Sequence, residues 1–225
     1  MAGFIVYFAL LSVVHLFFCY FEMRPYRVIT KPLIMLSLAV FYALAAKPMD
    51  FVVLAALICG LLGDVLLIPE KDGRFFIPGA LSFTLGHALY CLAIFRRTEG
   101  TTKEHLLTAA VFIALYLIVV AYASFRLEKH VDDKKMRVLM PTYLGIVGAV
   151  NVFAWVNLAS KINVGSGIFA SSLITLGSML FLASDTILAR SMFVKDVKRP
   201  NFPVMLTYIP AQLLLCLGFV LMGAK

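Results

Sequence analysis

Almost the whole chain is divided into long apolar segments separated by short polar gaps. Eight segments can be marked: Ala2–Phe21, Pro32–Ala46, Phe51–Pro69, Phe75–Phe95, Leu106–Phe125, Val138–Ala159, Ile168–Ala189 and Phe202–Met222. A helix needs about 20 apolar residues to cross the bilayer core, and seven segments meet that length. The second is short and is expected to begin near Val28, with Lys31 extending to the lipid headgroups. No segment alternates like a barrel strand, so all eight are predicted to be transmembrane helices.

The composition supports a membrane protein and excludes several other classes. Apolar residues make up 62% of the chain and charged residues 14%, against roughly 45–50% and about 25% in soluble domains. A secreted enzyme, a disordered chain and a soluble Rossmann domain are therefore excluded. The net charge is +8, but the basic residues stand in short gaps without interleaved aromatics, so no nucleic-acid partner is expected. The fold class predicted is all-α, as one transmembrane helical bundle over residues 1–225.

The gaps between segments differ in their content of Lys and Arg. Those after the first, third, fifth and seventh segments hold 14 of these residues, and the other side holds 6. Positively charged loops remain in the cytoplasm, so both termini are predicted to lie outside it. The membrane would be a bacterial inner membrane or a eukaryotic endomembrane. The sequence gives no indication of oligomeric state.

A weak internal repeat relates the two halves of the chain. The third segment contains GLLGDVLLI and the seventh LFLASDTILA, which aligns Asp64 with Asp185. The fourth contains GHALYCLAIF and the eighth PAQLLLCLGF, which aligns His87 with Gln212. Four helices in each half would give a 4+4 parallel repeat. Short apolar strings also match by chance, so duplication and coincidence both remain open.

Two carboxylates, Asp64 and Asp185, stand inside apolar segments, where a charge is costly and by default indicates a functional site. Asp64 is six residues before Glu70 and Asp185 five before Arg190. At the helical rise per residue, both would lie roughly 8–9 Å below the same membrane face. Matched depth allows them to converge on one site. The structural alternative is that each only holds a neighbouring helix or pairs with a buried His or Lys.

Other polar residues in the apolar segments are candidates for positioning the substrate or water. His87 stands in the middle of the fourth segment, and Tyr208 and Gln212 are one turn apart in the eighth. Asn151 in the sixth segment and Lys31 at the start of the second complete the set. A polar stripe in the seventh segment either lines water or contacts a neighbouring helix. It consists of Ser171, Thr175, Ser178 and Asp185, which share one helix face.

Metal chemistry is a rival use of these groups. A catalytic zinc usually has three protein ligands, mostly His, but only His15 and His87 lie within apolar segments and no HxxxH spacing occurs. A zinc amidase of the alkaline-ceramidase kind is therefore disfavoured. P-loop, GxSxG and Rossmann motifs do not occur either. No metal or other cofactor is expected.

Five strings occur in order from residue 30 to about residue 218: TKPL, GDVLLI, LGHALY, FLASDTILA and TYIPAQLLLCLG. Together they resemble the lysoplasmalogenase family, the YhhN-like integral membrane hydrolases. The resemblance implies hydrolysis of the vinyl ether bond of lysoplasmalogens, giving a fatty aldehyde and glycerophosphoethanolamine or glycerophosphocholine. It also implies that the family's two membrane aspartates correspond to Asp64 and Asp185. The partners would be a lysophospholipid, water and the bilayer.

The chemistry implied by the resemblance suits a pair of carboxyl groups. Vinyl ether hydrolysis passes through an oxocarbenium ion, as glycoside hydrolysis does. One protonated carboxyl would supply the proton, and one carboxylate would stabilise the cation and activate water. Asp185 is slightly favoured as the acid and Asp64 as the base, although the reverse remains open. A proton-coupled transporter that uses the same buried pair is the competing hypothesis.

Overall fold

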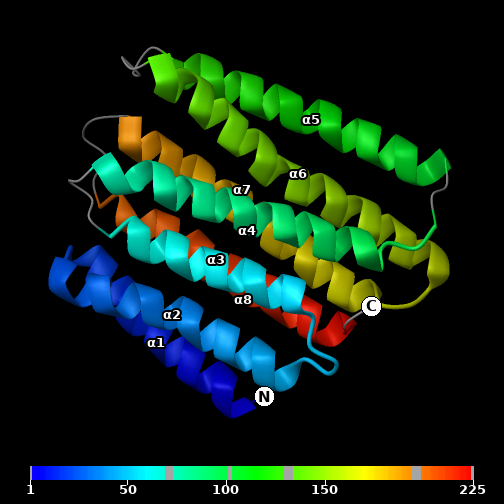
Figure 1. Ribbon diagram of the computed structural model, residues 1–225, viewed down its shortest axis with the longest axis horizontal. Helices are drawn as coiled ribbons and strands as arrows, with labels where there is room; N and C mark the ends of the chain where they lie inside the picture. The colour runs from blue at the N-terminus through cyan, green and yellow to red at the C-terminus, as the bar shows by residue number, and fades with distance from the viewer. Residues whose placement is uncertain (1, 69–72, 101–102, 129–133, 194–198, 224–225) are drawn as a thin grey trace.

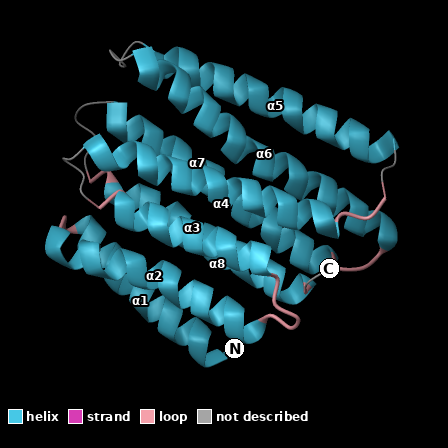
Figure 2. Cartoon of the chain, in the orientation of Figure 1, coloured by secondary structure: helices cyan, strands magenta, loops and turns pink. Residues whose placement is uncertain are grey.

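A computed structural model describes residues 2–68, 73–100, 103–128, 134–193 and 199–223. Within that part, the chain forms eight α-helices and one 3₁₀ turn and contains no β-strand (Figure 2). The helices are α1 (Ala2–Tyr20), α2 (Arg24–Ala45), α3 (Phe51–Leu66), α4 (Phe76–Arg97), α5 (Lys103–Glu128), α6 (Lys134–Val164), α7 (Ile168–Phe193) and α8 (Asn201–Met222). The predicted all-α class with eight helices is therefore confirmed.

The helices lie side by side along the long axis of the molecule, with successive helices running in opposite directions (Figure 1). α1 and α2 lie at one flank, α5 and α6 lie towards the other, and α3, α4, α7 and α8 lie between them. We call the end where α2, α4, α6 and α8 begin the site end. The opposite end, where α1 begins and α8 finishes, is called the termini end.

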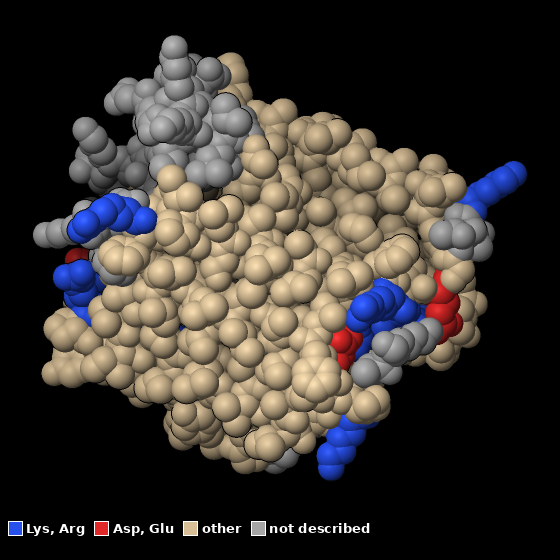
Figure 3. All heavy atoms as spheres, in the orientation of Figure 1, with Lys and Arg blue, Asp and Glu red and all other residues tan. Residues whose placement is uncertain are grey.

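The surface is that of a membrane protein. In the described part of the chain, seven helices are long and apolar enough to span a bilayer, and α3 is a shorter apolar helix. Large apolar side chains face outward along the helices, for example Leu44 with 73% of its surface exposed. On the face drawn in Figure 3, Lys, Arg, Asp and Glu lie near the two ends of the molecule, and the surface between them carries no coloured charged side chain. The chain is a multi-pass membrane protein.

The short helix is not the one that was predicted. α2 begins at Arg24 and has 22 residues, so it is a full-length span, whereas α3 has 16. Pro25 in the first turn favours helix initiation there, because its fixed φ suits the helix and its missing N–H has no partner to lose. α3 ends at Leu66 rather than near Glu70, so Asp64 lies in its last turn. Glu70 and Pro69 lie outside the described residues.

α7 and α8 pack closely because glycines replace side chains at their contact. A Cβ on Gly177 would lie 2.9 Å from the carbonyl oxygen of Ala211, and one on Gly218 would lie 2.9 Å from that of Ala170. Small residues allow this backbone approach in membrane helices, where apolar burial supplies little driving force. In the same helix α8, Tyr208 and Gln212 are almost fully buried. The 4+4 repeat stays a prediction.

The polar stripe of α7 contacts α6. Ser171 Oγ donates to Asn157 Oδ1 at 2.7 Å, Thr175 Oγ1 to the carbonyl oxygen of Ala154 at 3.2 Å, and Ser178 Oγ to Asn151 Oδ1 at 3.2 Å. Of the two predicted roles for this stripe, these bonds support helix–helix contact. They also fix the register of α7 against α6, which determines where Asp185 stands.

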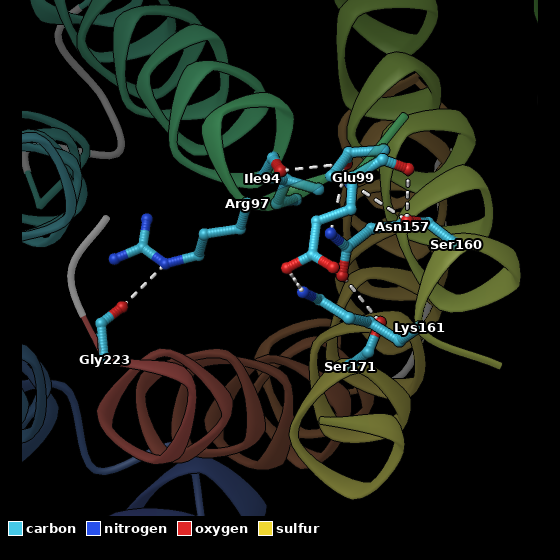
Figure 4. Close-up of polar contacts among 9 residues, drawn as sticks. Ile94, Arg97, Glu99, Asn157, Ser160, Lys161, Ser171 and Gly223 are labelled. Carbon is cyan, nitrogen blue, oxygen red and sulfur yellow. Dashed lines mark hydrogen bonds and ion pairs between the residues drawn. The ribbon is translucent and has the colours of Figure 1, made fainter. Parts of the chain in front are cut away.

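A second polar cluster lies at the termini end (Figure 4). Arg97 is fully buried at the end of α4; its Nε donates to the carbonyl oxygen of Gly223, and its Nη1 donates to Asp50 Oδ2 at 2.8 Å. Beside it, Lys161 of α6 pairs with Glu99 at 2.9 Å. These contacts tie the ends of α4, α6 and α8 together, far along the bundle from the site end.

Candidate active site

Asp64 is buried near the site end of the bundle, with 1% of its surface exposed. Its Oδ1 lies 3.0 Å from Lys31 Nζ, which comes from the second turn of α2. Its Oδ2 accepts a hydrogen bond of 2.8 Å from the hydroxyl of Tyr208 on α8. Each carboxyl oxygen thus has a donor, and the lysine supplies a positive charge. Lys31 keeps 25% of its side chain exposed, so the pair joins the buried carboxylate to a partly exposed cation.

Asp185 is buried on α7, with 5% of its surface exposed. Its Oδ2 accepts a hydrogen bond of 2.6 Å from the hydroxyl of Tyr143 on α6. Among the described residues, no basic side chain forms an ion pair with it. The two aspartates therefore stand in different surroundings: Asp64 has a cationic partner and Asp185 a neutral one.

The two aspartates belong to one electrostatic cluster. Charge interactions link Asp185 to both Asp64 and Lys31. They also link Tyr208, the partner of Asp64, to Asp185, and Tyr143, the partner of Asp185, to Asp64. Five helices supply these groups, since each of α2, α3, α6, α7 and α8 contributes one. Acids from distant parts of the chain thus lie near enough for their charges to interact.

Aromatic rings surround the cluster. Phe181 packs edge-to-face against Tyr208, with ring centroids 5.5 Å apart, and Phe83 does so at 6.5 Å. Phe83 in turn covers Gly63, where a Cβ would lie 2.7 Å from the phenylalanine ring. The glycine before Asp64 therefore allows the Phe83 ring of α4 to pack directly against the backbone of α3. Such surroundings exclude bulk water and strengthen electrostatic interactions.

His87 of α4 adjoins this cluster. Its ring packs edge-to-face against Phe181, with centroids 4.6 Å apart, and against Tyr143 at 6.1 Å. Its Nδ1 lies 2.6 Å from the carbonyl oxygen of Phe83, and only a protonated Nδ1 can donate to that acceptor. Its Nε2 is buried without a hydrogen-bond partner among the described residues.

The other two predicted positioning residues lie further along the bundle. Gln212 Oε1 accepts a hydrogen bond of 3.1 Å from the hydroxyl of Tyr90, one turn of α8 beyond Tyr208. Asn151 donates through Nδ2 to the carbonyl oxygen of Ser178 at 3.1 Å and accepts from the Ser178 hydroxyl. The contacts of Asn151 therefore join α6 to α7, and none of them reaches either aspartate.

The structure thus brings together Asp64, Asp185, Lys31 and Tyr208, with His87 beside them. Their catalytic or positioning roles stay predictions. Sequence reasoning missed Tyr143, the partner of Asp185. A signal existed, because Tyr143 stands two turns before Asn151 on the same face of α6. A tyrosine near a helix end is common at membrane interfaces, which hides that signal.

The residues described include no group of three or more His, Cys, Asp or Glu side chains arranged to hold a metal ion. The chemistry that this arrangement itself can supply is proton transfer and charge stabilisation. A buried carboxyl without a counter-ion, a carboxylate with one, and an imidazole with a bare nitrogen are suited to acid–base steps.

Comparisons with known proteins give one match. A family model described as the YhhN family matches residues 26–219, which is most of the chain and includes every residue of the cluster described above. No curated protein and no solved structure matches the chain.

Proposed function

Because the chain belongs to the YhhN family, we propose that it is a membrane hydrolase that cleaves the vinyl ether bond of lysoplasmalogens. Family membership suggests a membrane hydrolase. The substrate and the reaction are our proposal, which rests on the resemblance of the motifs and on the pair of buried aspartates. The products would be a fatty aldehyde and glycerophosphoethanolamine or glycerophosphocholine.

The proposed reaction begins with protonation of carbon. A proton added to the β-carbon of the vinyl ether leaves a positive charge shared between the α-carbon and the ether oxygen. Water then adds to the α-carbon, and the resulting hemiacetal separates into aldehyde and alcohol. The site must therefore hold one proton ready for carbon and one negative charge near the cation. A pair of carboxyl groups in unlike surroundings meets both needs.

The unequal partners of the two aspartates support one assignment of roles. Asp64 is paired with Lys31 and accepts from Tyr208, which suits a carboxylate that stays ionised and stabilises the cation. Asp185 accepts only the Tyr143 hydroxyl among the described contacts, which suits a carboxyl that carries the proton. Two close carboxyls in apolar surroundings do not both ionise readily. We therefore propose Asp185 as the acid and Asp64 as the anionic partner.

The remaining predicted residues take supporting roles in this proposal. Tyr208 and Tyr143 orient the two carboxyl groups through their hydroxyls. Lys31 fixes the charge of Asp64, and its partly exposed ammonium would meet the phosphate of the lysophospholipid headgroup. Gln212 would help to position Tyr208, which lies one turn away on α8. Asn151 would help to position α7, to which it is hydrogen-bonded. The substrate would approach from the bilayer, with its chain along the apolar interior.

The observation that carries the proposal is the meeting of Asp64 and Asp185 in one buried cluster. The test is aldehyde release by the detergent-solubilised protein from a lysoplasmalogen. The matched control substrate is the lysophospholipid with a saturated alkyl ether, which has no carbon–carbon double bond to protonate. We expect aldehyde from the first substrate only. No aldehyde from either, together with proton-dependent uptake in proteoliposomes, would favour the transporter instead.

A further inference from the structure

We infer that His87 is a third catalytic group of this site, whose bare Nε2 accepts a proton from the water that adds to the oxocarbenium ion. The inference deepens the proposed function and rests on it. In this proposal the proton released by water is taken up by His87 rather than by Asp64 or Asp185. The observation behind it is a buried, oriented imidazole nitrogen that has no hydrogen-bond partner among the described residues.

The hydrogen bond at Nδ1 fixes the tautomer of His87. A carbonyl oxygen can only accept, so the 2.6 Å contact with Phe83 places the ring proton on Nδ1. His87 is 3% exposed, and an isolated imidazolium is costly in apolar surroundings. The ring is therefore neutral, and Nε2 presents a lone pair. The nitrogen that is free is the one that can act as a base.

The unpaired state of Nε2 calls for an explanation. Buried polar atoms nearly always have a hydrogen-bond partner, and one that lacks it loses its hydration without compensation. In the described residues, His87 Nε2 has no such partner. If His87 served only helix packing, its Nε2 would contribute nothing to stability, because phenylalanine would make the same ring contacts. A water molecule, the second reactant of the proposed reaction, is the ligand that would complete it.

The position of His87 relative to both acids supports the same role. Its ring contacts Tyr143, which holds Asp185, and Phe181, which contacts Tyr208, the partner of Asp64. The hydrogen bond from Nδ1 to the Phe83 carbonyl oxygen holds the orientation of the imidazole between these rings. By contrast, both oxygens of Asp64 already have donors, one of them the cationic Lys31. The cluster thus offers a proton donor, a fixed negative charge and a free proton acceptor.

The protons balance over one turnover. Asp185 gives its proton to the β-carbon, whose π electrons form the new C–H bond. The oxygen of water then bonds to the α-carbon, and one water proton passes to His87 Nε2. When the hemiacetal collapses, its hydroxyl proton returns to Asp185 and the C–O bond to glycerol breaks. The glycerol oxygen takes the proton from His87, and both groups regain their starting states.

The experiment measures aldehyde release and chemical rescue in His87→Ala. A general base contributes about 10²–10⁴-fold in rate, so we expect turnover to fall at least about 100-fold. Added imidazole should restore a measurable part of it, because it fills the vacated space and presents a basic nitrogen. Pyrrole has the same size but no in-plane lone pair and should restore nothing. A purely structural role would let both molecules rescue equally.

If His87→Ala does not fold, a second variant at the same position still tests the proposal, and a control variant on the same helix shows whether substitution in α4 is itself harmful. His87→Phe retains a ring for the contacts with Phe181 and Tyr143, and it should be inactive without rescue by either molecule. Thr84→Val on the same helix removes a hydroxyl that bonds only within α4, and it should behave as wild type. Wild-type turnover in folded His87→Phe, or rescue of His87→Ala by pyrrole, overturns the role of His87 alone. Absence of aldehyde from the wild-type protein overturns the proposed function and this inference together.

Discussion

Replacing Lys31 by methionine should destabilise the bundle and abolish turnover. The substitution keeps an unbranched side chain but leaves Asp64, which is 1% exposed, without its counter-charge 3.0 Å away. Removing one partner of a buried ion pair costs about 3–5 kcal/mol. Lys31 itself is 25% exposed, so water at the interface relieves part of that loss, and we expect the lower limit of about 3 kcal/mol.

A double-mutant cycle separates the charge effect from loss of packing. Thermal unfolding in detergent is followed for Lys31→Met, Asp64→Asn and the double variant. If the unpaired charge is the cause, the double variant should be more stable than Lys31→Met alone, since no buried charge remains. The matched control is Lys161→Met at the termini end, whose partner Glu99 has 34% of its side chain exposed. Because Glu99 is only partly buried, Lys161→Met should lose less stability than Lys31→Met.

The reasoning about Asp64 would be refuted by additive effects in this cycle, or by a Lys31→Met protein as stable and as active as wild type. In that case the carboxylate would not need the lysine, and the assignment of Asp64 as the ionised partner would fail. Lys31→Arg, which keeps the charge, should retain more activity than Lys31→Met. Loss of activity with unchanged stability would instead place Lys31 on the substrate.

Three further predictions address topology, metal dependence and packing. The 14-to-6 distribution of Lys and Arg predicts that a C-terminal reporter active only in the cytoplasm is silent; a strong signal would reverse the orientation. Aldehyde release should survive prolonged chelation, whereas loss that one specific metal restores would favour Asp64, Asp185 and His87 as ligands. Gly177→Val should lower stability in detergent by about 1–3 kcal/mol or more because its side chain meets α8 backbone; a wild-type melting temperature would contradict the α7–α8 packing.

Much of the fold could be predicted because lipid imposes a simple rule. Only helices satisfy their backbone in a bilayer, so long apolar segments determine the number and the approximate bounds of the elements. The error concerned α2 and α3. Apolar content alone located the second segment at Pro32, although Pro25 favours initiation at Arg24. The matched depth of the two aspartates was counted from Glu70, which lies outside the described residues, so it stays a prediction.

The two aspartates of the candidate site could be predicted from the sequence, but the side chains that contact them could not. A carboxylate among apolar residues is conspicuous in a sequence, and both aspartates entered one cluster. The partners depend on which helices pack against each other. The residue pattern within a single helix does not give that information. Thus Tyr143 was missed, and Asn151, polar and mid-helix, turned out to bond with α7. The orientation rests in part on Lys71, Lys129, Lys195, Lys198 and Lys225, which lie outside the described residues, so it stays a prediction.

The most direct measurement is the turnover of Asp64→Asn and Asp185→Asn on a lysoplasmalogen. Asparagine keeps the shape and much of the hydrogen bonding but removes the titrating carboxyl. A positioned acid or base contributes about 10²–10⁴-fold, so each variant should lose at least about 100-fold while melting near the wild-type temperature. The double variant should be little worse, because groups that act as a unit are not additive. Glu22→Gln, at an exposed position after α1, is the control and should change little. Near-wild-type turnover in either folded asparagine variant would contradict the two-carboxylate mechanism, and loss of folding in both would show that the aspartates hold helices together.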